Sequence, residues 1–231
     1  MTEAPSERTR VKRLNKRAKY DTETVHGILD ASPVCHVGYL FKGTPYVTPT
    51  LQWREGDHIY WHGSSASRML ETCVEADVCV TVTMIDGMVM ARAAFHHSCN
   101  YRSVMVMGKA QIIRDPAEKE QRLKTFVDKL FPGRWDILRP VTSKELKATI
   151  MLGLSLDEAS AKVRCGPPGD DEDDYALPIW AGLIPMRTEI LKPIADERNL
   201  PGLAPPAHVM HFKLGQCPTD HSIPAMRRPS M

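Results

Sequence analysis

Val34–Trp61 has the sequence VCHVGYLFKGTPYVTPTLQWREGDHIYW, in which three runs rich in β-branched and aromatic residues follow one another. Two short turn signals, Lys42-Gly43 and Glu55-Gly56-Asp57, separate these runs. Such residues favour strands, and such short turns join antiparallel neighbours. The stretch therefore predicts three antiparallel strands, over residues 34–40, 46–54 and 58–61.

Strand signals continue beyond this stretch, over residues 78–84, 88–95 and 104–113. Asp86-Gly87, between the first two of them, is typical of a hairpin turn. Six strands of moderate length with few helices favour a closed or partly closed antiparallel barrel. We therefore expect a mainly β chain of the α+β class, with helices flanking a six-stranded barrel.

Four helices are expected around the strands. Val25, Ile28 and Leu29 share one face of a helix over 22–31, which Asp21 or Thr22 can cap. A second helix is expected over 65–75 and a fourth over 143–152. The third, over 115–130, has a capping residue, Asp115, followed by a proline at the first helical position.

The two ends of the chain differ from its middle. Residues 1–19 form a basic arm, and residues 191–231 form a Pro-rich tail without apolar periodicity. We place one domain between them, over 20–190, with a mobile acidic loop at 165–174. The arm could meet nucleic acid or an anionic membrane, or it could pack on the fold or a partner. No aromatic residues are interleaved with its charges, so we expect no nucleic-acid partner.

Composition is ordinary for a globular chain of 231 residues, with 42% hydrophobic and 25% charged residues and a net charge of +2. No apolar run approaches the roughly 18 residues that span a bilayer, and no secretory signal is visible. Six cysteines form no CxxC pair, which indicates buried thiols in a reducing compartment. We expect a cytoplasmic protein without a membrane partner.

Two segments combine small hydroxylated residues with an arginine. His62–Leu70 (HGSSASRML) leads from a strand into a helix, and Asn100–Lys109 places Arg102 and Ser103 at the start of an apolar strand. An arginine fork binds phosphate bidentately, and serine hydroxyls satisfy further oxygens. The segments therefore predict a phosphate site, although surface charge for Arg68 and a cross-strand ion pair for Arg102 are the alternatives.

Motifs for side-chain catalysis or metal binding are missing. The sequence has no GxSxG, GxxxxGK[ST], HExxH or GxGxxG motif, so the catalytic residues stay unknown. His96 and His97 are adjacent, and adjacent side chains of an extended segment point to opposite faces. We therefore expect no metal site.

A flat aromatic cofactor with a phosphate tail suits the remaining features better. Several aromatic residues stand near the phosphate segments, among them Tyr46, Trp53 and Tyr101. A flavin ring needs main-chain donors and acceptors along its edge, and the extended segment Val47-Thr48-Pro49-Thr50 can offer them. The alternative for this segment is a plain edge strand, since Pro45 and Pro49 remove donors.

Five stretches together give the chain a family resemblance. They are Thr44–Thr50, Ile59–Ser64, Ser67–Met69, Ser98–Val104 continuing to Gly108-Lys109-Ala110, and Pro178–Gly182. In this order they resemble the pyridoxamine 5′-phosphate oxidase-like superfamily of FMN-binding split β-barrels. Within it, the chain is most similar to the flavin-nucleotide-binding, nitroimidazole-resistance-type branch. The resemblance covers residues 10–190.

The resemblance implies a six-stranded antiparallel split β-barrel that forms a homodimer, with FMN, or alternatively FAD, at the subunit interface. Val47 to Thr50 would then lie along the isoalloxazine ring, and Trp61 and His62 near the ribityl chain. Ser67 and Arg68 match the phosphate-binding pair of the family, while Arg102 and Ser103 match the strand that returns to the cofactor. The full set of expected cofactor-binding residues is Val47, Thr48, Pro49, Thr50, Trp61, His62, Gly63, Ser64, Ser67, Arg68, Met69, Asn100, Tyr101, Arg102, Ser103 and Trp180.

Two departures from the family pattern limit the function. Met69 stands where the family often has a lysine, so one partner for the phosphate charge is missing, and His62 can compensate as a donor. Trp180 is present, but the Arg-x-His motif of the true vitamin B6 oxidases does not follow it. Oxidation of pyridoxamine phosphate is therefore not expected.

Three functions remain open. The first is a flavin-dependent oxidoreductase acting on a small molecule, with NAD(P)H as a candidate electron donor. The second is a flavin carrier or sensor without turnover. The third is a split barrel that binds haem or another planar cofactor, which His62 and the pair His96-His97 would favour.

Overall fold

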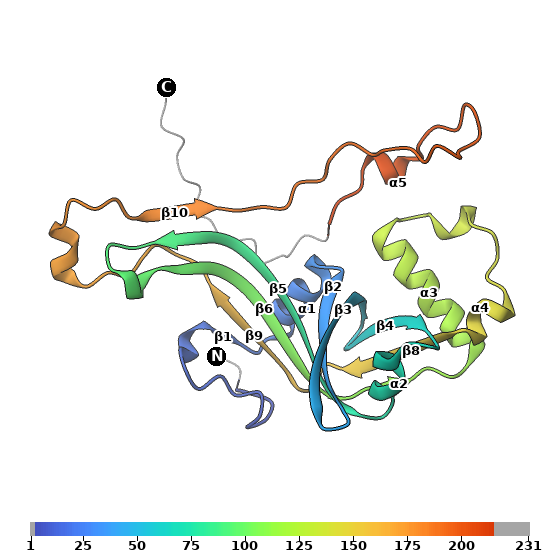
Figure 1. Cartoon of the computed structure of the whole chain (residues 1–231), viewed down its shortest axis with the longest axis horizontal. Helices are drawn as coiled ribbons and strands as arrows, with labels where there is room; N and C mark the ends of the chain where they lie inside the picture. The colour runs from blue at the N-terminus through green and yellow to red at the C-terminus, as the bar shows by residue number, and fades with distance from the viewer. Residues whose placement is uncertain (1–2, 215–231) are drawn as a thin grey trace.

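The structure, a computed structural model, describes residues 3–214, and these form one antiparallel sheet of ten strands (Figure 1). The strand order is β1-β9-β6-β5-β2-β3-β4-β8-β7, and β10 pairs with β5 outside this path. The mainly β architecture is confirmed, but the expected number of six strands is wrong.

The strands are β1 (Ala18–Lys19), β2 (Val34–Phe41), β3 (Thr44–Glu55), β4 (His58–Ser64), β5 (Asp77–Met90), β6 (Ser98–Lys109), β7 (Gln111–Ile112), β8 (Thr149–Ser155), β9 (Ala159–Arg164) and β10 (Gly182–Pro185). The α-helices are α1 (Thr22–Ala31), α2 (Arg68–Cys73), α3 (Pro116–Leu130), α4 (Ser143–Lys147) and α5 (Ala207–Met210). Short 3-10 helices are η1 (Asn15–Arg17), η2 (Ala94–His96), η3 (Trp135–Ile137) and η4 (Glu172–Ala176).

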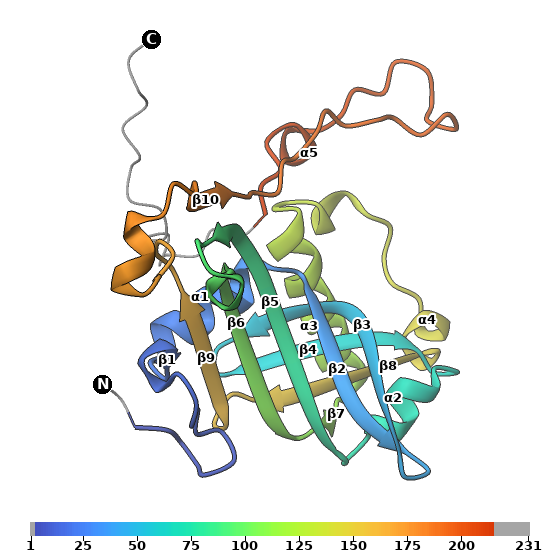
Figure 2. The same cartoon turned by 60° about the vertical axis from the view of Figure 1, so that its left-hand side comes forward.

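The sheet curls into a barrel (Figure 2). β7 lies at one edge of the strand order, yet it follows β6 in the chain after the single residue Ala110. The far edge of the sheet therefore returns to β6. The interior is filled by apolar side chains from alternate positions of the strands, including Val37, Trp61 and Leu152, which are inaccessible to solvent. α1 packs against β3, β5, β6 and β9, and α2 packs against β2, β4 and β8.

Capping residues locate the starts of two helices as the sequence predicted. The Asp21 carboxylate accepts a hydrogen bond from the Thr24 backbone N–H at 2.9 Å, and α1 spans the predicted residues 22–31. The Asp115 carboxylate accepts one from the Glu118 N–H at 2.8 Å at the start of α3. Each cap satisfies a backbone donor that the first turn leaves unpaired.

The predicted hairpin at Asp86-Gly87 is wrong, because both residues lie inside the single 14-residue strand β5. The pairing with β6 shifts between Ile85 and Gly87, which makes Asp86 the extra residue of a bulge. The Asp86 backbone oxygen accepts a hydrogen bond from the Met186 N–H at 3.0 Å, directly after β10. Asp86-Gly87 therefore forms a bulge within β5, and β10 pairs beside it.

The predicted helix over 143–152 is also wrong in its second half. α4 ends at Lys147, and β8 begins at Thr149. β8 lies between β4 and β7, and four consecutive residues from Met151 to Leu154 are buried. A short apolar run buried on both faces has no period that separates a strand from a helix. Gly153 fits the strand because a Cβ there would lie 2.8 Å from the Tyr60 ring.

The basic arm packs on the fold over its described part. β1 pairs with β9, and an ion pair joins Arg8 to Glu158. From residue 191 until α5 the tail has no helix or strand and makes two turns, closed by hydrogen bonds from the Asn199 N–H to the Asp196 oxygen and from the Leu203 N–H to the Leu200 oxygen. Residues 215–231 of the tail lie outside the described part of the chain. No helix among residues 3–214 is long and apolar enough to cross a membrane.

The cysteines are only partly as expected. Burial raises the pKa of the Cys35 thiol to about 12 and that of Cys73 to about 11, so both are unreactive at neutral pH. Cys165, in contrast, is exposed, and Cys217 lies outside the described residues.

The close approach of β10 at Gly87 gives a test of this fold. A Cβ at Gly87 would lie 2.8 Å from the Ile184 backbone oxygen and 3.2 Å from the Pro185 Cα. Gly87→Ala should therefore displace β10 and cost about 1–3 kcal/mol of stability, as other overpacked sites do. Hydrogen exchange of the β10 amides should become faster. Gly169→Ala is the control, since nothing lies within 4 Å of its Cβ position. Unchanged exchange in Gly87→Ala would contradict the pairing of β10 with β5.

Candidate functional site

The first predicted phosphate segment lies where β4 turns into α2. The Ser67 side chain caps α2 and accepts from the Leu70 N–H, and the Ser67 N–H donates to the Ser64 backbone oxygen at 2.9 Å. The Ser64 hydroxyl accepts from the Ala66 N–H at 3.2 Å. α2 has only six residues, so its dipole is small and side chains must supply most of the attraction for an anion.

Arg68 is the free cation of this corner. Its guanidinium carbon lies 4.6 Å from the centre of the Tyr46 ring and 5.2 Å from that of Phe41. Within residues 3–214 it forms no ion pair, and the family's lysine position beside it is Met69, whose side chain is buried in the core. The guanidinium is held by aromatic faces and keeps its N–H donors available for a ligand.

The predicted ring platform, Val47 to Thr50, lies on a strand that has one open edge. β3 pairs with β2 along residues 44–51, but its pairing with β4 covers only residues 52–55. Backbone groups that point away from β2 over 44–51 therefore have no strand partner in the described chain. The Val47 side chain is 68% exposed, and the Thr48 hydroxyl lies 3.4 Å from that of Tyr39. This edge can offer donors and acceptors to a planar ligand.

Residues 61–63 of β4 differ in what they present. Trp61 is fully buried inside the barrel, so its side chain is not accessible to a ligand outside. His62 faces the other side and packs against two aromatic rings, with centroid distances of 5.7 Å to Trp53 and 5.1 Å to Phe126. A Cβ on Gly63 would lie 3.0 Å from a methyl of Leu70, so this residue permits the close approach of β4 and α2.

The second predicted phosphate segment is engaged within its own chain. Arg102 donates two hydrogen bonds to the Asp86 carboxylate, at 3.0 and 2.7 Å, and both side chains are almost buried, at 13% and 12% exposure. Asn100 bonds to the Gly166 backbone oxygen and to Arg164. The cross-strand ion pair, which the sequence left as the alternative for Arg102, is the one observed. A phosphate-binding role of Arg102 would require this pair to open, and it stays a prediction.

Tyr101 and Ser103, the other predicted residues of this segment, pair with β9. Tyr101 lies opposite Arg164, and the Ser103 hydroxyl donates to the Lys162 backbone oxygen at 3.4 Å. Trp180 precedes β10, and its indole covers Gly182, where a Cβ would meet it at 2.9 Å. Its side chain is 66% exposed, which leaves it available for a further contact.

The strand register separates these two groups of residues. Arg68 lies over Tyr46, which pairs with Tyr39 of β2. The adjacent residue of β2, Gly38, pairs with Cys79 near the start of β5, so Arg68 lies at the level of that end of β5. Arg102 pairs with Met84 further along β5, and Gly182, beside Trp180, pairs with Met90. At about 3.3 Å per residue, Arg102 lies roughly 17 Å and Trp180 roughly 35 Å along β5 from the level of Arg68. One chain therefore does not bring the predicted residues together around one ligand.

Burial makes His62 chemically unusual. Its Nδ1 is buried and has no hydrogen-bond partner in the described chain, and desolvation lowers the pKa of the ring. A lowered pKa keeps the imidazole neutral at physiological pH, which is the form that ligates metals. Trp53 and Phe126 therefore surround one basic atom with apolar rings.

The sequence did not identify two polar clusters elsewhere. His96, Asp170 and Asp174 bring three potential ligand atoms within 4.8 Å of one another, but Arg92 already bonds to the Asp170 carboxylate at 3.0 Å. Glu55, Arg122 and Tyr60 line a cavity of about 610 Å³ beside α3, and Arg122 donates to Glu55 at 2.7 Å. Neither cluster carried a sequence motif, because each joins residues far apart in the chain.

The cavities do not coincide with the predicted residues. One of about 930 Å³ is lined by the basic arm, including Arg10, Lys16 and Tyr20. Five cavities of the described chain contain none of the sixteen predicted cofactor-binding residues. The residues around β3 and α2 form an open surface within one chain.

The pKa of His62 predicts how stability depends on pH. The folded pKa lies below the ordinary value of 6.5, so the unfolded chain binds a proton more readily between the two values. The stability of the folded chain is then complete above pH 6.5 and falls as the pH drops below it. The melting temperature should fall more steeply between about pH 7.5 and 5.5 in the wild type than in His62→Gln. Parallel profiles would show that His62 is not desolvated.

Three known structures resemble this chain to different degrees, and a sequence model of the family described as pyridoxamine 5′-phosphate oxidase matches residues 21–163. The flavocytochrome Anf3 from Azotobacter vinelandii is 54% identical with a TM-score of 0.90, over 93% of this chain and 100% of its own. The FAD and heme binding protein from Mycobacterium smegmatis is 33% identical with a TM-score of 0.81, over 85% of this chain and 97% of its own.

A third structure is more distant. It belongs to a protein named for 5-nitroimidazole antibiotic resistance from Bacteroides thetaiotaomicron, at 22% identity and a TM-score of 0.49, over 63% of this chain and 86% of its own. No curated protein matches the chain.

Proposed function

The chain belongs to the pyridoxamine 5′-phosphate oxidase family, and from this premise we propose that it is a flavin- and haem-binding redox protein. The proposal is supported by two structures that cover most of the chain, one named a flavocytochrome and one an FAD and heme binding protein. The observation in this chain that carries it is the open edge of β3 together with Arg68, which forms no ion pair within residues 3–214.

The residues around β3 fit a flavin nucleotide. The open backbone edge over 44–51 supplies hydrogen-bonding groups for the ring, and exposed Val47 supplies an apolar contact for its face. Arg68 is the available cation for the phosphate, with the Ser64 and Ser67 hydroxyls beside it. FAD is favoured over FMN by the name of the relative from Mycobacterium smegmatis.

We propose further that the flavin site is shared between two copies of the chain in a homodimer. Arg68 and Trp180 lie roughly 35 Å apart along β5, so both can contact one flavin only from different copies. A shared site also requires that each copy leave part of its binding surface uncovered, as the surface around β3 does. The dimer also explains why Trp180 keeps an exposed face.

His62 fits a haem. Its buried Nδ1 has no hydrogen-bond partner within residues 3–214, and its ring packs edge-on against Trp53 and Phe126. Burial lowers its pKa, which favours the neutral, ligating form. His62 lies next to the proposed flavin surface, because β4 pairs with β3 in the sheet. Two other histidines of the described chain have a buried ring nitrogen without a hydrogen-bond partner: His96, at the distant tip between β5 and β6, and His208, in α5.

Flavin and haem, when bound, supply the electron-transfer chemistry, and the protein supplies position and electrostatics. The roles of this chain follow from its contacts. Arg68 and the serines hold the phosphate, the β3 backbone orients the ring, and Trp53 and Phe126 exclude water from His62. We propose an oxidoreductase acting on a small molecule, with NAD(P)H as a candidate donor and a cytoplasmic location. A carrier without turnover is the alternative.

Removal of Arg68 should weaken flavin binding. Arg68→Ala removes the charged donor of the proposed phosphate corner, so FAD binding should weaken by ~1.5–3 kcal/mol. The measurement is titration of apo-protein with FAD, followed by quenching of flavin fluorescence. Arg114→Ala, at an exposed arginine outside the site, should bind as the wild type does. Equal affinity in Arg68→Ala and Arg114→Ala would refute the phosphate assignment.

The absorbance spectrum separates the two proposed roles of His62. Loss of the Soret band in His62→Ala, with flavin bands retained, is the expected result for a haem ligand. Loss of the flavin bands alone would instead assign His62 to the ribityl chain, as the family resemblance implies. His58→Ala, on the same strand, is the control and should keep both sets of bands. A His62→Ala protein with an unchanged spectrum would contradict both roles.

A further inference from the structure

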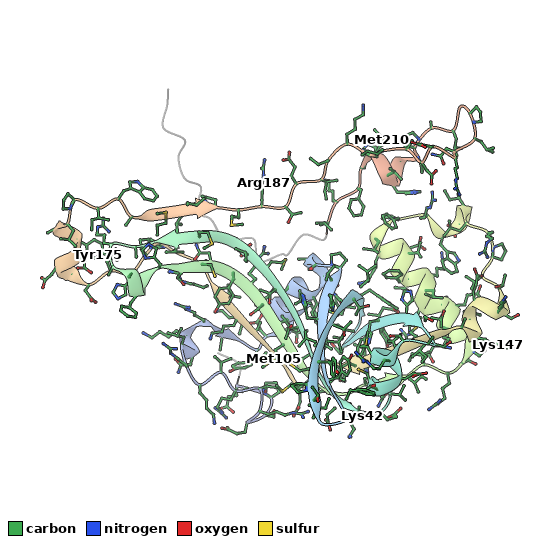
Figure 3. All side chains as sticks on the ribbon, in the orientation of Figure 1. Lys42, Met105, Lys147, Tyr175, Arg187 and Met210 are labelled. Atoms are coloured by element: carbon green, nitrogen blue, oxygen red, sulfur yellow. The ribbon has the colours of Figure 1, made fainter. Side chains whose placement is uncertain are left out.

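A strap of about twenty residues, 187–206, connects β10 to α5 and is attached to the fold at both ends (Figure 3). At its start, β10 pairs with the distal end of β5. After its end, the Phe212 ring packs 5.5 Å from Phe131, which follows α3. Figure 1 shows the strap crossing from one end of the molecule to the other, away from the barrel.

The strap contacts almost nothing in its own chain. Every residue from Ile184 to Pro205 is exposed, including Leu191 at 77% and Ile194 at 96%. Its large exposed apolar residues are Ile190, Leu191, Ile194, Leu200 and Leu203. Holding such a segment in one conformation costs backbone entropy that burial among residues 3–214 does not offset. The described part of the chain therefore offers the strap no surface that would stabilise it.

The composition of the strap indicates the kind of surface that it fits. Residues 187–206 contain three basic and three acidic residues, so the segment carries no net charge for a lipid headgroup or nucleic acid. Four prolines, at 193, 201, 205 and 206, restrict its backbone and lower the entropy lost on docking. A neutral, stiff, apolar segment suits the apolar surface of another protein.

A second copy of this chain offers such a surface. The outer faces of β2, β3 and β5 carry large exposed apolar residues that no helix of the described chain covers, namely Val34, Leu40, Val47, Leu51 and Ile85. The open backbone edge of β3, which is part of the proposed flavin site, borders this face, and that site is incomplete in one copy. The strap and the uncovered face are thus two apolar surfaces that association of two copies would bury together.

We propose that the strap of each copy clasps the other copy, with Leu191 and Ile194 packed against it. The proposal rests on the shared site of the proposed function, and it adds a segment, 187–206, that holds the two copies together. Exchange of two straps across a two-fold axis gives each copy the same contacts. The clasp keeps the surfaces that flank the flavin site in contact.

The test replaces strap side chains in the full-length protein. The double variant Leu191→Asp/Ile194→Asp should raise the dimer dissociation constant at least tenfold in sedimentation analysis. Lys192→Asp, which adds the same charge between them, should leave the constant unchanged. A wild-type constant in the double variant, or a monomeric wild type, would overturn the clasp.

Two further readouts separate this proposal from the flavin proposal. Trypsin should cut after Arg187 and Arg198 more slowly above the dimer dissociation constant than below it, and a rate independent of concentration would overturn the clasp. Flavin content, read by absorbance at high protein concentration, should be retained in the double variant. A wild-type protein that dimerises without binding flavin would refute the flavin proposal and leave the clasp intact.

Discussion

The long ladder between β5 and β6 is the constraint on which the rest of the structure depends. Its strands run through the barrel wall at one end and far beyond it at the other, because Asp86 forms a bulge where a turn would have ended β5. β10 and the strap can attach only because this ladder extends past the barrel. Because β5 and β6 are long, Arg68 at one end of this ladder lies far from Arg102 and Trp180 further along it.

The sequence predicted the elements whose signals are local. α1 and α3 begin where Asp21 and Asp115 cap them, since a cap is a contact between residues three apart. Asp86-Gly87 was misleading because its role depends on Arg102 and on β10, both distant in sequence. The β8 strand was missed because burial on both faces leaves no period to detect.

The candidate site shows the same division. The Ser67-Arg68 pair lies at a strand-to-helix turn, as the sequence predicted, because that geometry is set within a few residues. Arg102 also stands beside a serine in the sequence, but its guanidinium pairs with the Asp86 carboxylate on the neighbouring strand. No local sequence pattern reveals this pairing. The desolvation of His62 depends on Phe126, 64 positions later in the chain. The family resemblance implied both the flavin and its place at the interface of a homodimer. The strand register, which separates Arg68 from Trp180, supports the proposal that two copies share the site.

The central claim is that each flavin site takes Arg68 from one copy and Trp180 from the other. Its most direct test is the flavin stoichiometry of a heterodimer that pairs an Arg68→Ala copy with a Trp180→Ala copy, purified through two different affinity tags. In a shared arrangement, one site of this heterodimer carries both substitutions and the other carries neither. We predict that it binds one flavin per dimer with wild-type affinity, while each homodimeric variant binds weakly at both sites. Two equally weakened sites in the heterodimer would place the whole flavin site within one chain and contradict the account.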